Sequence, residues 1–190
     1  MADKPQRKER TQRKEFKGGD FEREFEEKTI EIRRVAKVVK GGRRFAFRVT
    51  VIVGDRGGQV GAGVGKANTV PDAIKKASTR ARKNMRRMNL YFSTIPHQVV
   101  GRVGGSEVML KPASPGTGVI AGGGVRAVLQ AVGVQDILTK SMGASNILNV
   151  VFATLNALDQ LKSLDEAAAM RGKDVTQLKP FWDRSKKNGN

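Results

Sequence analysis

Cysteine is absent from the sequence, and histidine occurs once, as His97. A chain without cysteine has no disulfide framework and no thiolate metal site, and one histidine cannot build a histidine cluster. Zinc chemistry is therefore excluded, and we expect neither a metal site nor any other cofactor.

Long hydrophobic runs are also missing. The chain has no stretch of about 18 consecutive apolar residues, and its N-terminus lacks the apolar core of a signal peptide. We therefore expect a soluble, cytoplasmic protein with no membrane among its partners.

Acidic residues are scarce beside basic ones, and the imbalance is concentrated in one segment. The 190 residues include 36 Lys and Arg against 18 Asp and Glu, a net charge of +18. Residues 30–96 hold sixteen basic and three acidic side chains, so +13 of the charge lies there. A field of this sign attracts polyanions, and nucleic acid is the leading candidate. Residues 1–29 are nearly balanced, with nine basic and eight acidic side chains, and we expect residues 1–25 to be a mobile charged tail.

Residues 26–95 are expected to form a first domain with the order β-β-β-α. Residues 29–40 are rich in β-branched side chains, and Gly41 and Gly42 supply the positive φ angles of a tight hairpin turn. Residues 43–53 then alternate with a period of two. The alternation predicts a core face and a basic face, the former with Phe45, Phe47, Val49, Val51 and Val53, the latter with Arg44, Ala46, Arg48 and Thr50.

A third strand is predicted after the turn at residues 55–58. Its inner face is expected to carry Val60, Ala62 and Val64, and its outer face carries three glycines. Glycines in a strand allow another backbone to approach closely.

A basic helix is predicted to begin after Thr69 and to run to about Met88. Thr69 is the expected N-cap, and Pro71 lies in the first turn. Helical spacing gathers apolar residues on one stripe and seven cations on the opposite side: Lys75, Lys76, Arg80, Arg82, Lys83, Arg86 and Arg87. A charged helix face is usually only solvated. Seven cations with no acid at i,i+4 repel one another, however, and this favours contact with RNA phosphates.

The β-β-β-α order with a basic helix resembles the double-stranded RNA-binding module, which reads A-form shape and 2′-hydroxyls more than sequence. Base stacking is less favoured, because Phe45 and Phe47 are expected on the core face, while Tyr91 and Phe92 lie beyond the helix. No aromatic platform is therefore predicted.

Residues 96–165 are expected to form a second, two-layer α/β domain with the order β-β-α-β-α. Its predicted elements are a hairpin at residues 99–111, helices at residues 121–132 and 146–161, and a strand at residues 135–140. Residues 166–190 follow as a polar C-terminal extension. The fold class is therefore α+β, with two domains.

A glycine-rich loop before the helix at residue 121 raises the possibility of a nucleotide-binding enzyme. The P-loop pattern fails, because Val60 and Ala67 occupy positions that require Gly and Ser or Thr. The loop resembles the phosphate loop of the galactokinase and homoserine kinase superfamily, but Val119 and Ile120 replace its two serines. We therefore expect no catalytic residues and no enzyme activity. Two explanations of the glycines stay open: tight packing of the helix on the sheet, and contact with RNA phosphates.

Three long motifs occur in order: VVKGGRRFAFRVTVIVGDRGGQVGAGVGKA, VPDAIKKASTRARKNM and PASPGTGVIAGGGVRAVLQAVGVQDILTKSMGASNILNVV. On these motifs the chain resembles the bacterial-type ribosomal protein S-five family of the small subunit, over residues 26–175. The resemblance implies a structural protein that binds small-subunit rRNA between body and head and supports decoding accuracy. It also implies contacts with ribosomal proteins four and eight, and with mRNA near its entry. The hairpin tip at residues 37–44 would reach the neck, near the spectinomycin site.

We expect the RNA contacts to come mainly from cations of the first domain. The candidate RNA-binding residues are Lys37, Lys40, Gly41, Gly42, Arg43, Arg44, Arg48, Arg56, Lys66, Lys76, Arg80, Arg82, Lys83, Arg86, Arg87, Lys111 and Arg126. A free-standing regulator that binds double-stranded RNA is the alternative function.

Overall fold

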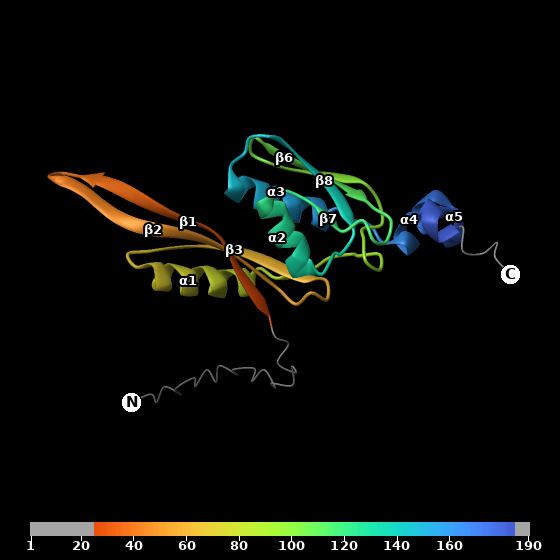
Figure 1. Cartoon of the computed structure of the whole chain (residues 1–190), viewed down its shortest axis with the longest axis horizontal. Coiled ribbons are helices and arrows are strands. Elements are labelled where there is room, and N and C mark those ends of the chain that lie inside the picture. The colour runs from red at the N-terminus through yellow and green to blue at the C-terminus, as the bar shows by residue number, and fades with distance from the viewer. Residues whose placement is uncertain (1–24, 185–190) are drawn as a thin grey trace, which may run out of the picture.

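The computed structural model describes residues 25–184. Apart from Phe25, the predicted N-terminal tail at residues 1–25 lies outside this range, as do the last six residues of the predicted C-terminal extension. Figure 1 shows two β-sheets, with helix α1 below the first sheet and the second domain above it. No helix within residues 25–184 is long and apolar enough to cross a membrane.

The first sheet is antiparallel and has the strand order β1-β2-β3-β4. It consists of β1 (Glu26–Val39), β2 (Gly42–Gly54), β3 (Gln59–Ala67) and β4 (Arg86–Arg87), and it packs on α1 (Val70–Lys83). The predicted hairpin turn is confirmed, with Gly41 at φ +90°. The predicted N-cap is confirmed as well, because the Thr69 hydroxyl accepts a hydrogen bond from the Asp72 N–H.

Helix α1 ends at Lys83, so the prediction that it runs to Met88 is wrong. Asn84 is the C-cap, and the chain then turns so that Arg86 and Arg87 pair with β3 as the short strand β4. A continued helix would keep Met85 and Met88 on one stripe. In the structure Met85 packs against the cluster under α1, while Met88 is buried in a different cluster on the other side of the sheet.

The glycines of β3 face α1, which reverses the predicted inner and outer faces of that strand. A Cβ atom added to Gly63 would lie 2.2 Å from the carbonyl oxygen of Ala77 on α1. The absence of side chains at this position therefore lets the helix backbone rest directly on the strand. Close approach by another backbone was predicted correctly, but the backbone is that of the domain's own helix.

The alternating strand β2 is buried on both faces over its second half. Val49, Val51 and Val53 pack under α1, as predicted, whereas Ile52 on the opposite face belongs to a core shared with the second domain. The predicted basic face is therefore confined to the first half of β2, and the predicted core face is fully buried only in the second half. Thr50, expected on the basic face, is buried at 2% exposure.

The second sheet has the order β5-β6-β8-β7. It contains the predicted hairpin of β5 (Val99–Val103) and β6 (Ser106–Pro112), then β8 (Ile137–Gly143) and the short parallel strand β7 (Val119–Ile120), which was not predicted. Helices α2 (Gly123–Val132) and α3 (Ile147–Asp159) complete the second layer. The mixed α+β fold with two domains is confirmed.

A common core joins the two domains. Val60 and Ala62 of β3 and Met88 lie in one buried cluster with side chains of α2 and α3. The backbone N–H of Arg56 also donates to the carbonyl of Ala131 at 3.0 Å. Movement of the first sheet relative to α2 would break these contacts, so the domains form one packed unit.

Three short helices follow the second domain: α4 (Leu164–Arg171), α5 (Val175–Leu178) and α6 (Phe181–Arg184). Ser163 and Glu166 form a capping box at the start of α4. The Tyr91 hydroxyl donates to the Asp183 carboxylate at 2.5 Å, and burial followed by this hydrogen bond raises the pKa of Tyr91 to about 12. This part of the extension is therefore helical and tied to the body of the protein.

Candidate nucleic-acid interface

The β1–β2 hairpin projects beyond the rest of the first domain. Strand β3 pairs with β2 only as far as Phe47, and from that row to the turn residues 34–47 form an arm of two strands. Figure 1 shows this arm extending past both α1 and the second domain. Surfaces of the arm are therefore accessible from two sides.

One face of the arm and its base carries a row of cations. The β1–β2 register places Lys37 opposite Arg44, and places Arg33, Arg48 and Lys66 side by side across three strands. These two rows lie four residues apart, roughly 13 Å along the strands. All five side chains point away from α1, because their positions alternate with those that contact the helix. We call this set the cationic face: Arg33, Lys37, Arg44, Arg48 and Lys66.

The cationic face has little internal neutralisation. Within residues 25–184, its one ion pair joins Arg33 to Glu31, at 2.5 Å. At the tip, Lys40 and Arg43 are exposed beside the Gly41–Gly42 turn, and neither forms an ion pair with a carboxylate of the described residues. Such a cluster of like charges is repulsive, and a polyanion relieves the repulsion.

The cations of α1 lie on the other side of the sheet. Lys76 and Lys83 are exposed on the helix, and a guanidinium nitrogen of Arg80 donates to the carbonyl of Val64 at 2.6 Å. Arg82 forms an ion pair with Glu27 of β1 at 2.9 Å. The predicted set is therefore split between two surfaces, and some of its helix cations are already held by the protein.

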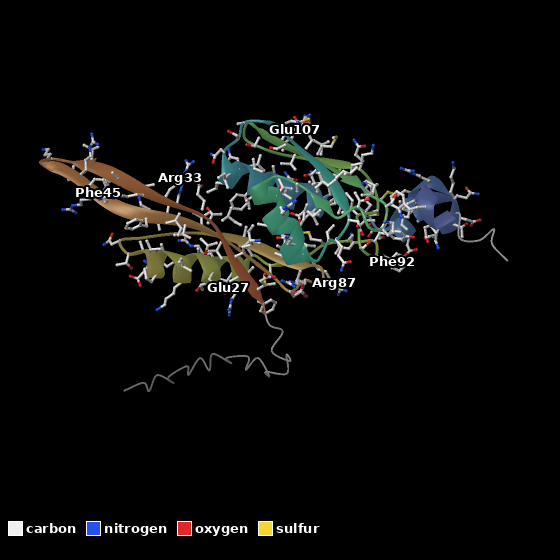
Figure 2. The ribbon with its side chains drawn as sticks, viewed as in Figure 1. Glu27, Arg33, Phe45, Arg87, Phe92 and Glu107 are labelled. Carbon is white, nitrogen blue, oxygen red and sulfur yellow. The ribbon has the colours of Figure 1, made fainter. Side chains whose placement is uncertain are left out.

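Arg56, Arg86 and Arg87 lie away from the arm. Arg56 is at the opposite end of the first sheet, where its ion pair with Glu26 at 2.7 Å lowers the pKa of that carboxyl group below its usual value. In Figure 2, Arg87 is seen at this end of the sheet, far from Phe45 and Arg33.

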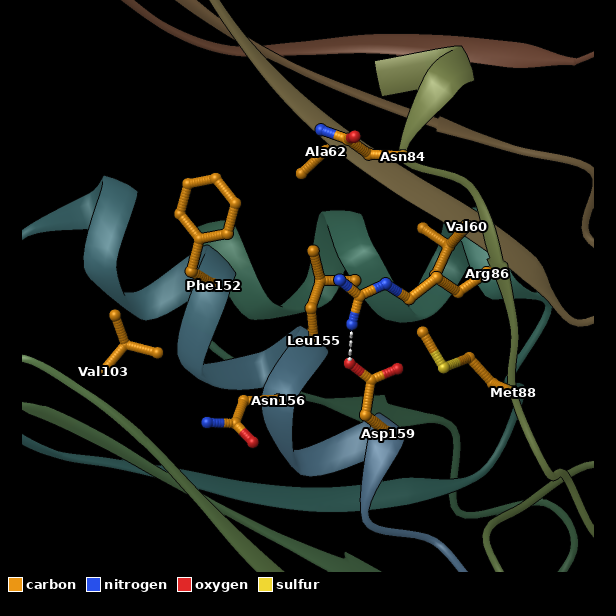
Figure 3. A pocket seen from close by; sticks show the side chains of 10 residues that line it. All are labelled: Val60, Ala62, Asn84, Arg86, Met88, Val103, Phe152, Leu155, Asn156 and Asp159. Atoms are coloured by element: carbon orange, nitrogen blue, oxygen red, sulfur yellow. Dashed lines mark hydrogen bonds and ion pairs between the residues drawn. The ribbon is translucent and has the colours of Figure 1, made fainter. Parts of the chain in front are cut away.

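Arg86 crosses to the second domain. It contacts Asp159 of α3 at 2.5 Å over a cavity of about 480 Å³, also lined by Phe152 and Leu155 (Figure 3). This ion pair joins β4 to α3, and it leaves Arg86 less available to RNA than the sequence suggested.

The two predicted contact residues of the second domain, Lys111 and Arg126, lie on separate elements. Lys111 is exposed on β6, and Arg126 of α2 donates to the carbonyl of Val119 at 2.9 Å. Neither residue belongs to the first sheet, which carries the cationic face.

The glycine-rich loop is held by a carboxylate of the protein itself. Asp136 is 5% exposed and accepts hydrogen bonds from the backbone N–H groups of Gly116 at 2.9 Å and Gly118 at 3.0 Å. The Gly118 N–H is the largest cause of a lowered pKa for Asp136, with further contributions from the Ser93 side chain and neighbouring N–H groups, while burial acts in the opposite direction. These amides already have an anionic partner, which favours a structural explanation of the loop over binding of an RNA phosphate.

Replacement of Asp136 by alanine is expected to lower the free energy of unfolding by about 1–3 kcal/mol at neutral pH, because two partly buried N–H groups lose their acceptor. Folding lowers the pKa of Asp136, so the contribution is complete above its usual value of 3.8 and is lost as the pH falls below that value. Urea midpoints of wild type and Asp136→Ala, measured over a pH series, should converge in acid. Equal midpoints at neutral pH would show that the loop does not depend on this carboxylate.

Two cations, one in the arm and one at its base, were missed in the sequence analysis. Arg33 completes the row with Arg48 and Lys66, and Arg34 lies over the ring of Phe45 at 3.8 Å from its centroid. Strand alternation from the Gly41–Gly42 turn backwards could have identified Arg33, since it shares a face with Lys37.

Comparison with known proteins accounts for both domains. The family model described as ribosomal protein S5, N-terminal domain, matches residues 25–89, and the model described as ribosomal protein S5, C-terminal domain, matches residues 101–171. Small ribosomal subunit protein uS5 of Thermotoga maritima is 52% identical over 155 residues, which cover 82% of this chain and 87% of the relative. The chain belongs to the ribosomal protein S5 family.

A second member of the S5 family shows the same level of similarity. Small ribosomal subunit protein uS5 of Thermotoga neapolitana is 53% identical over 153 residues, which cover 80% of this chain and 85% of the relative. The arm and the cationic face fall within the N-terminal family domain, and the Asp136 loop falls within the C-terminal one.

Proposed function

We propose that this S5-family chain is a structural constituent of the small ribosomal subunit that binds rRNA and has no catalytic role. The observation that carries the proposal is the cationic face on a projecting arm, in a chain that is 52% identical to a small-subunit protein. Neutralisation of phosphates by such cations releases counterions and supplies affinity without reading base sequence.

The two surfaces of the first domain would contact different RNA segments. The cationic face and the outer side of α1 lie on opposite sides of one sheet, so a single RNA helix cannot lie flat against both. An arrangement between two RNA elements, such as those of the body and head, suits this geometry. The arm's distance from the second domain allows it to reach RNA that the rest of the protein does not touch.

The second domain would hold the arm in a fixed direction. The shared core around Val60 and Met88, and the hydrogen bond between Arg56 and Ala131, resist rotation of one domain against the other. We infer that ribosomal proteins four and eight contact the second domain, and that mRNA near the entry channel is a further partner. A rigid connection of this kind would transmit changes at those neighbours to the RNA at the arm, in keeping with a role in decoding accuracy.

The proposal predicts that a Lys40→Ala, Arg43→Ala, Arg44→Ala triple variant will fold but will be poorly incorporated into small subunits. All three residues are exposed, so the free energy of unfolding should change by about 1 kcal/mol or less. Incorporation is measured by competing tagged variant and wild type in cells and quantifying both in purified small subunits. We expect the variant to be depleted among assembled particles.

A charge-matched control separates the arm from net charge. The Lys162→Ala, Arg171→Ala, Lys173→Ala variant also loses three exposed cations, at the opposite end of the molecule. It should be incorporated almost like wild type. Equal incorporation of the two variants would refute the role of the arm, and wild-type protein found mainly outside ribosomes on duplex RNA would favour the regulator.

A further inference from the structure

The face of the arm and its base that lies opposite the cationic face carries several exposed apolar side chains. Ile32, Val38 and Phe45 are exposed to 50%, 74% and 49%, and they account for half of the large apolar side chains found exposed within residues 25–184. The register places all three on the side of the sheet that α1 covers further along. The cluster under α1 extends toward the tip only as far as Phe47 and Ala67, which pair with each other, so Phe45 and Val38 lie beyond it.

Phe45 is the aromatic centre of this surface. Its cross-strand neighbour is Ala36, whose small side chain leaves the flank of the ring open. The guanidinium of Arg34 lies over the ring, 3.8 Å from the centroid. This contact fixes one face of the ring, so the exposure that remains belongs chiefly to the other face and the ring edge. The sequence pattern had assigned Phe45 to the core, and this assignment is wrong because the helix ends its cover before the strand does.

The charge around Phe45 points to the chemistry of its partner. Arg43 lies on the same face as Phe45, two residues nearer the tip. Arg44 and Lys37 lie on the opposite face of the same two strands. Close approach of an apolar protein segment would desolvate these cations without neutralising them. A nucleotide can neutralise the cations and also cover the aromatic ring. Its phosphate pairs with the cations, and its base has an apolar face that stacks on an aromatic ring.

We propose that Phe45, with Arg34 stacked on its ring, is a stacking site for an unpaired nucleobase of the RNA that the arm binds. The proposal rests on the proposed function, since it assumes an RNA partner. It adds that the arm distinguishes an unpaired base from a continuous duplex, whereas the cationic face contacts phosphates alone. Bases inside a duplex are already stacked and cannot reach the ring.

The test measures binding of the full chain to two RNA duplexes that differ in one group. One duplex carries a single bulged adenosine, and the other carries an abasic residue at the same bulge, so phosphate number and bulge flexibility are matched. Wild-type protein should prefer the base-containing bulge by at least about fivefold, the lower range for stacking of one base on an aromatic side chain. Phe45→Leu should remove this preference and leave affinity for the abasic duplex unchanged, and Phe45→Tyr should retain it.

Two further variants test whether a loss of base preference in Phe45→Leu could come from destabilised folding. Phe47 lies on the same face as Phe45, two residues further into the sheet. Its side chain is partly buried and packs against the cluster under α1. Phe47→Leu should lower the urea midpoint but keep the base preference. Arg34→Lys keeps the charge but loses the planar stack, and it should weaken the preference without unfolding the protein.

The outcomes separate the stacking site from RNA binding itself. Equal wild-type affinity for the two bulges, or equal losses on both in Phe45→Leu, would overturn the stacking site and leave the proposed function standing. Wild-type protein that binds neither RNA in a salt-dependent way would overturn the proposed function together with the inference.

Discussion

Gly63→Ala is expected to unfold the first domain or to lower its free energy of unfolding by about 3 kcal/mol or more, at or above the usual upper end for overpacking. The added Cβ would lie 2.2 Å from the carbonyl oxygen of Ala77 and 2.5 Å from the amide nitrogen of Ala81. Both atoms belong to the backbone of α1, so no rotamer change can relieve the overlap. The helix must move away from β3 and expose the cluster of Val49, Val51 and Val53 that it covers.

Gly123→Ala is the matched control. The substitution is chemically identical, but a Cβ atom at Gly123 meets nothing within 4 Å in the described residues, and the position lies at the start of α2. Alanine in a helix is favoured over glycine by about 0.5–1 kcal/mol, so this variant should be as stable as wild type or slightly more so. Urea unfolding followed by circular dichroism compares the three proteins. A Gly63→Ala midpoint equal to that of wild type would contradict the close packing of α1 on β3.

Local features of the fold could be predicted from the sequence because their causes are local. The Gly41–Gly42 turn follows from backbone freedom at φ +90°, and the start of α1 follows from the Thr69 cap. The end of α1 was missed. Helical spacing alone continued through Met88, whereas pairing of Arg86 with Val60 on β3 is a contact between segments far apart in the chain.

Burial on both faces of β2 could not be predicted for a similar reason. A period of two identifies the face that a strand buries within its own domain. Ile52, on the other face, is buried by helix α2, more than seventy residues later in the sequence. The same limit applies to Phe45, whose exposure depends on where α1 begins and not on the strand's own pattern.

The candidate interface was predicted in composition but not in arrangement. Charge counting placed +13 of the net charge of +18 in residues 30–96. It treated all cations alike, although Arg56, Arg82 and Arg86 are each paired with an acid distant in sequence. The structure thereby separates cations that stabilise the fold from those left to bind a partner. The role of each remaining cation in RNA binding stays a prediction.

The second large expected effect is a steep fall in RNA affinity as the salt concentration rises. Lys37, Lys40, Arg43, Arg44, Arg48 and Lys66 are six arm and base cations with no carboxylate ion pair within residues 25–184. Six phosphate contacts would lower affinity for duplex RNA by about 10³ between roughly 50 and 200 mM salt, on the scale known for duplex DNA. The experiment uses the full chain, because the first domain shares its core with the second domain. An isolated first domain would expose Ile52 and Met88, which are buried in that shared core.

Electrostatic binding by the arm is tested most directly by the slope of log affinity against log salt concentration. The slope is measured on one RNA duplex for wild type and for the Lys40→Ala, Arg43→Ala, Arg44→Ala variant. The slope is expected near −5 for wild type and shallower by roughly 2 to 3 for the variant, because three phosphate contacts are lost. The charge-matched variant at Lys162, Arg171 and Lys173 should keep the wild-type slope. A flat salt response in wild type, or the same slope in both triple variants, would contradict the account.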